Sequence, residues 1–152
     1  MKQNLKKASI LFLISFSLFS CGNNDQRILK DVEKHSGINY LSSAKIVFSY
    51  TNISGFEDRA GPVYYVLDYS NSNKKEQFIN EYFFNKRDKN GEFEMALNEF
   101  VQKELGGVYY SFDKQYQLDL EAPYSYYYEE NLFLVYYEKS SAAYFLYHLW
   151  IP

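Results

Sequence analysis

Residues 132–151 read LFLVYYEKSSAAYFLYHLWI, and this stretch carries the clearest strand signal of the chain. Two runs rich in apolar and aromatic residues, 132–138 and 142–151, flank the short polar connection Lys139-Ser140-Ser141. Such runs on either side of a few polar residues predict two antiparallel strands joined by a tight hairpin.

Four upstream stretches have the pattern of strands. Residues 44–52 alternate apolar and polar side chains, and residues 63–69 form a nearly continuous apolar run. Residues 108–112 and 116–120 are two more candidates, with alternation clearest in the second. We expect all four to be β-strands.

Three stretches have helical spacing instead. Residues 25–36 carry one apolar stripe and are followed by Gly37, which is well placed to end a helix in the left-handed conformation. A second helix is expected to begin near Asn73, and a third covers residues 92–105.

The order of these elements predicts the fold class. One helix, two strands, two helices and four strands follow each other along the chain, so strands and helices do not alternate. This order disfavours a parallel, doubly wound sheet. We therefore predict a single α+β domain with a mostly antiparallel sheet and about three helices packed on one face.

The N-terminus has the pattern of an export signal. Lys2, Lys6 and Lys7 precede an uncharged, apolar run at residues 8–19, which is too short to span a membrane as a helix. Leu18-Phe19-Ser20-Cys21 follows, and it resembles the lipobox of bacterial lipoproteins. The chain thus resembles a small bacterial lipoprotein of unknown function.

This resemblance implies a lipidated N-terminus. Signal-peptide cleavage would fall between Ser20 and Cys21, and the Cys21 thiol would carry the lipid. The expected organisation is a signal peptide at residues 1–20, a lipidated tether at 21–25 and one domain at 26–152. The implied location is the cell envelope, lipid-anchored to a membrane, and the outer membrane if the host is Gram-negative.

Composition and charge exclude several classes of function. The chain has 152 residues with 16 basic and 19 acidic side chains. The leader holds three lysines and no acid, so residues 21–152 have a net charge of −6, which makes nucleic acid an improbable partner. A single cysteine excludes a disulfide framework, and with only His35 and His148 we expect no metal and no cofactor.

One loop has an unusual set of charged residues. Glu57, Asp58 and Arg59 lie between Gly55 and Gly61, and we consider them a possible functional loop against the simpler interpretation of a solvated turn. Ser-Gly-Ile at 36–38, Ala-Lys-Ile at 44–46 and this glycine-containing loop also resemble segments of small bacterial proteins of unknown function. That resemblance implies no activity.

Tyrosine is the most distinctive residue type, with 17 copies against one tryptophan. Consecutive tyrosines in a strand point to opposite faces of a sheet, so some of them are expected to be exposed. We predict a binding face at Tyr126, Tyr127, Tyr128, Tyr136 and Tyr137.

These features predict a non-enzymatic module. The first interpretation is a protein-binding or accessory module with an envelope protein as its partner, in its sharper form an inhibitor or immunity protein. The alternative is a glycan-binding module that uses exposed tyrosines. A small hydrolase that unites His148 or His35 with a serine and an acid ranks third, because the sequence contains no catalytic motif.

Overall fold

The computed structural model describes residues 24–53, 59–87 and 91–151. The described residues form an α+β fold around one six-stranded antiparallel sheet with the strand order β1-β2-β6-β5-β4-β3, which confirms the predicted class. The strands are β1 (Lys45–Thr51), β2 (Arg59–Asp68), β3 (Asn85–Lys86), β4 (Ser125–Glu129), β5 (Leu132–Tyr137) and β6 (Ala142–Ile151).

Helices account for most of the remaining described residues. The N-terminal helix is described over residues 24–36. The others are α2 (Lys75–Tyr82), α3 (Glu92–Phe100), its π-helical continuation (Val101–Leu105) and α4 (Gly107–Ser111), with short 3₁₀ turns at Leu41–Ser43 and Lys114–Tyr116. The three predicted helices are therefore confirmed, and Gly37 has the expected positive φ of 74°.

The hairpin at residues 132–151 forms the middle of the sheet. Leu132 pairs with Tyr147 and Tyr137 pairs with Ala142, which leaves a connection at residues 138–141. Ser141 lies in this connection with a φ of 55°. β2 then pairs along the full length of β6, from Arg59 to Asp68.

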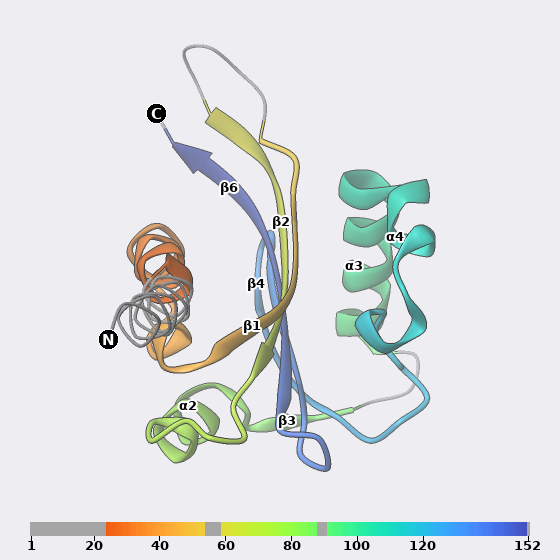
Figure 1. Ribbon diagram of the computed structural model, residues 1–152. Coiled ribbons are helices and arrows are strands. Elements are labelled where there is room, and N and C mark those ends of the chain that lie inside the picture. The colour runs from red at the N-terminus through yellow and green to blue at the C-terminus, as the bar shows by residue number, and fades with distance from the viewer. Residues whose placement is uncertain (1–23, 54–58, 88–90, 152) are drawn as a thin grey trace, which may run out of the picture.

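Helices cover both faces of the sheet, and the prediction of helices on one face is wrong (Figure 1). The N-terminal helix and α2 pack on one face through Leu29 and Phe78. Helices α3 and α4 pack on the other face through Leu97 and Tyr109. All six residues of β5 are buried, and an uninterrupted apolar run is typical of a strand covered on both sides.

The prediction of two strands, at residues 108–112 and 116–120, is wrong. Residues 108–112 lie mostly in helix α4, because Gly106 has a φ of 55° and starts a new turn. Residues 116–120 begin at the end of the 3₁₀ turn and continue as a loop, and they form no strand. The backbone N–H of Leu118 instead donates a hydrogen bond to the hydroxyl of Tyr109 at 2.8 Å.

Strand β4 was not predicted as an element. Its sequence, Ser-Tyr-Tyr-Tyr-Glu, has no apolar alternation, since tyrosine occupies three successive positions. Alternation is present all the same: Tyr127 packs on the face of the N-terminal helix and α2, and its neighbours Tyr126 and Tyr128 pack on the other.

Gly61 is required where β1 and β2 meet. A Cβ atom at this position would overlap the carbonyl oxygen of Asn52. The backbone of Asn52 donates its N–H to the oxygen of Pro62 at 3.1 Å, so the two chains approach closely here.

The buried tyrosines predict that the fold is lost in alkali. Burial raises the pKa of Tyr64 and of Tyr69 far above the usual 10, and it raises the pKa of Tyr82 to about 12. The unfolded chain ionises above pH 10 while the native chain holds its protons, so stability falls with rising pH by about 1.4 kcal/mol per pH unit for each fully buried tyrosine.

We expect the far-UV circular dichroism to be lost cooperatively above pH 10. The absorbance of the tyrosinates that were buried should appear in the same transition. Complete ionisation of all tyrosines while the circular dichroism stays native would contradict this prediction. In Tyr64→Phe the drop in stability between pH 10 and pH 12 should be smaller.

Candidate functional site

The five tyrosines predicted as a binding face do not form an exposed surface. Tyr136 and Tyr137 are only 2% and 8% exposed, and Tyr126, Tyr127 and Tyr128 are half-buried. The prediction is wrong in this respect, because helices cover the sheet faces that the tyrosine rings occupy.

The rings of these tyrosines pack against aromatic rings of the helices and of the residues next to them. Tyr126 stacks on Phe93 of α3 with ring centroids 4.0 Å apart. Tyr127 meets Tyr82 of α2 edge-on at 5.2 Å, and Tyr136 stacks on Phe83 at 5.2 Å. Aromatic pairs at these distances are typical of core packing, so the tyrosines fasten helices to the sheet.

Several predicted site residues lie outside the described residues. Ser20 and Cys21 belong to this group, as do Glu57 and Asp58. Arg59 is described, and it is an exposed residue at the start of β2.

The two histidines are not brought together. The backbone oxygen of His35 accepts a hydrogen bond from Tyr147, on the face of the N-terminal helix and α2. His148 pairs instead with Glu104 of the π-helical segment, with 2.8 Å between Nδ1 and Oε2. A carboxylate can orient a histidine base in this way, but no serine among the described residues hydrogen-bonds to His148.

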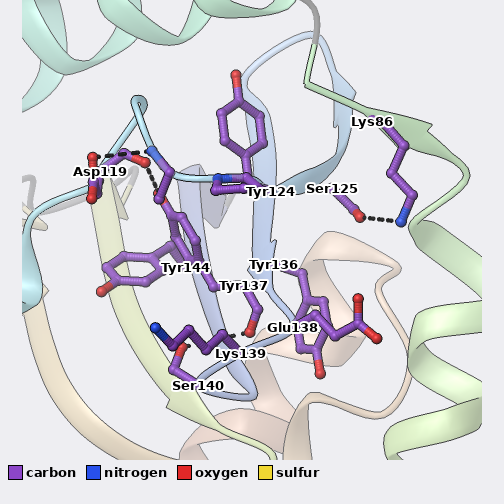
Figure 2. Close-up of a pocket in the computed structure, with 12 residues that line it drawn as sticks. Lys86, Asp119, Tyr124, Ser125, Tyr136, Tyr137, Glu138, Lys139, Ser140 and Tyr144 are labelled. Carbon is purple, nitrogen blue, oxygen red and sulfur yellow. Dashed lines mark hydrogen bonds between the residues drawn. The ribbon is translucent and has the colours of Figure 1, made fainter.

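A hollow of about 880 Å³ lies where β4 begins and β5 ends. We call it the sheet-end hollow, and Figure 2 shows its lining. Strand β3, the loop before β4, the adjoining ends of β4 and β5, the following turn and β6 all contribute to it. The lining residues are Lys86, Asp119, Ala122, Pro123, Tyr124, Ser125, Tyr136, Tyr137, Glu138, Lys139, Ser140 and Tyr144.

Hydrogen bonds hold the loop that forms one wall of this hollow. The backbone oxygen of Asp119 accepts a bond from the hydroxyl of Tyr137 at 2.8 Å. One carboxylate oxygen of Asp119 accepts the N–H groups of Glu121 and Ala122, at 3.1 and 3.3 Å. These contacts within the chain hold this wall in place.

Tyr124 and Arg87 fasten the same loop to α3. The hydroxyl of Tyr124 donates a hydrogen bond to Glu94 at 2.6 Å, and Arg87 lies 3.4 Å from the same carboxylate. Burial and the nearby Glu94 carboxylate raise the pKa of Tyr124, so its hydroxyl stays protonated and remains a donor. Arg87 also donates to the backbone oxygen of Glu121 at 2.8 Å.

No family model, curated protein or solved structure matches this chain. Function must therefore be argued from the geometry of the site itself.

The polar groups of the hollow include two that sequence reasoning missed. Lys86 Nζ donates a hydrogen bond to Ser125 Oγ at 2.8 Å, although 39 positions separate the two residues. Nothing in the local pattern marks either residue, because the contact exists only once β3 pairs with β4. A second, smaller hollow of about 380 Å³ shares Lys86, Pro123 and Tyr124.

Tyr136 also lines the hollow and carries an unpaired polar atom. Its hydroxyl is buried, and it is the one buried side-chain polar atom without a hydrogen-bond partner within the described part of the chain. A buried orphan hydroxyl is costly and calls for water or a ligand as its partner.

Two further features bear on cofactors and membranes. Within residues 24–53, 59–87 and 91–151, no group of three or more metal-ligating side chains is placed to hold a metal ion. None of the described helices is both long enough and apolar enough to cross a membrane.

Proposed function

We propose that this chain is a lipid-anchored protein of the cell envelope, and that it lies in the outer membrane if the host is Gram-negative. Its α+β domain would be a non-enzymatic binding module. The sheet-end hollow is the proposed binding site. A concave site with a few placed polar groups is the usual form of a small-ligand site, and this observation carries the proposal.

The anchor is argued from the lipobox. Only residues 22 and 23 lie between Cys21 and residue 24, the first described residue, so these three peptide steps can span about 10 Å at most. The domain would therefore work next to the membrane surface, and its partners would be envelope components.

Two kinds of ligand fit this proposal. The first is a segment of an envelope protein that inserts into the hollow, with an inhibitor or immunity protein as the sharper version. The second is a glycan. Concavity favours the glycan, since a protein interface usually needs a broad surface of about 800 Å² on each partner.

The binding site can be tested by filling it. Ser140 is exposed on the turn that lines the hollow, so Ser140→Trp adds bulk there without disturbing the core. Ser111→Trp is the matched control, because Ser111 is also exposed but lies at the end of α4.

We expect crosslinking in the native host, read by mass spectrometry, to recover the same partner or glycan with the wild-type chain and with Ser111→Trp. Ser140→Trp should lose it by about tenfold or more. Equal recovery with both tryptophan variants would remove the hollow from the proposal.

A further inference from the structure

Lys86 and Ser125 form a polar pair with unused donors. They are cross-strand partners of β3 and β4, so their side chains lie on the same face of the sheet. Ser125 is 7% exposed, and among the described residues it is the one polar, non-aromatic residue that is buried. It accepts the hydrogen bond from Lys86, and its own proton and two protons of the ammonium group have no acceptor among the described residues.

Among the described residues, no carboxylate balances the charge of Lys86. No described carboxylate lies within 4.0 Å of its ammonium group, whereas Arg87, the next residue, pairs with Glu94 and Glu121. Figure 2 shows Lys86 and Asp119 on opposite sides of the hollow. A lysine held by a buried hydroxyl, with its free donors at a concave surface, is a ready partner for an anionic oxygen.

We propose that Lys86 and Ser125 form a carboxylate-binding subsite of the sheet-end hollow, and that the ligand is an acidic sugar. This inference rests on the proposed function of the hollow as a binding site. The rim carries Asp119 and Glu138 as acceptors and Lys139 as a donor, which suits a ligand with several hydroxyl groups. The volume of 880 Å³ accommodates more than one sugar ring.

The test compares two ligands that differ only at one carbon. Methyl glucuronide carries a carboxylate where methyl glucoside carries a hydroxymethyl group. Saturation-transfer NMR on the full chain in detergent gives a dissociation constant for each. We expect the glucuronide to bind about tenfold more tightly, since hydrogen bonds to a charged group are the stronger ones.

Lys86→Met keeps the aliphatic stem but removes the charge. In this variant the glucuronide should bind no more tightly than the glucoside, while binding of the glucoside is unchanged. Ser125→Ala should lower the preference about threefold. Lys30→Met is the control, because Lys30 is an exposed lysine of the N-terminal helix and should leave the preference intact.

Three results would overturn the inference. These are equal binding of the two sugars, a preference that survives Lys86→Met, and carboxylate-dependent binding of N-acetylglutamate amide over N-acetylglutamine amide without any binding of the sugars. The last result assigns the subsite to an acidic peptide. If Ser140→Trp still abolishes partner capture while the sugars bind equally, the binding site stands and only the carboxylate subsite is lost.

Discussion

A Cys21→Ala variant is expected to lose all incorporation of an alkyne-tagged fatty acid and to leave the membrane fraction. Cys21 carries the only thiol of the chain, so no second site can accept a thioether-linked lipid. Two or more acyl chains hold a protein stably on a bilayer, whereas an unlipidated, acidic chain has no comparable attraction to it. The readout is labelling in the native host followed by membrane fractionation.

Ser20→Ala provides the control for this experiment. Alanine keeps the small side chain that the lipobox requires before the cysteine, so labelling should match the wild type. Retention of label in Cys21→Ala would overturn the anchor, and with it the proposed location in the envelope. It would leave the fold and the hollow untouched.

The second large effect is expected in the core. Phe145 is fully buried in β6, the strand between β2 and β5, and its ring stacks on Tyr65 with centroids 6.4 Å apart. Phe145→Ala removes the ring from a site that the rigid sheet cannot collapse to fill. We expect a loss of about 3–5 kcal/mol in the free energy of unfolding.

The matched control is Phe84→Ala, because Phe84 is 75% exposed between α2 and β3. Its free energy of unfolding should change by no more than about 0.5 kcal/mol. Urea unfolding followed by circular dichroism gives both values from the midpoint at a constant slope. Similar midpoints for the two variants would contradict the central place of β6 in the core.

Local pattern was enough for elements whose stability is decided nearby in the chain. The hairpin of β5 and β6 was predictable because two apolar runs and a short polar turn leave few alternatives. Gly37 was predictable because a residue with positive φ is needed after the N-terminal helix, and its N–H bonds to Glu33 at 2.9 Å.

Local pattern failed where distant residues decide the outcome. The segment around Tyr109 has high strand propensity, yet it becomes α4 because the ring of Tyr109 packs against Tyr64 of β2, with centroids 6.0 Å apart. The tyrosines of β4 occupy successive positions, which suggested that some of their rings are exposed on one face of the sheet. Their rings are instead covered by α2 and α3, two helices that contact opposite faces of the sheet.

The sequence by itself therefore determined the α+β class, the hairpin of β5 and β6 and the three helices. These depend on composition, periodicity and short motifs, which act over a few residues. Only the tertiary structure decided which faces the helices cover, which tyrosines are buried and where the hollow lies. Lys86 meets Ser125 across 39 positions, and a contact of that kind depends on strand pairing that no local pattern encodes.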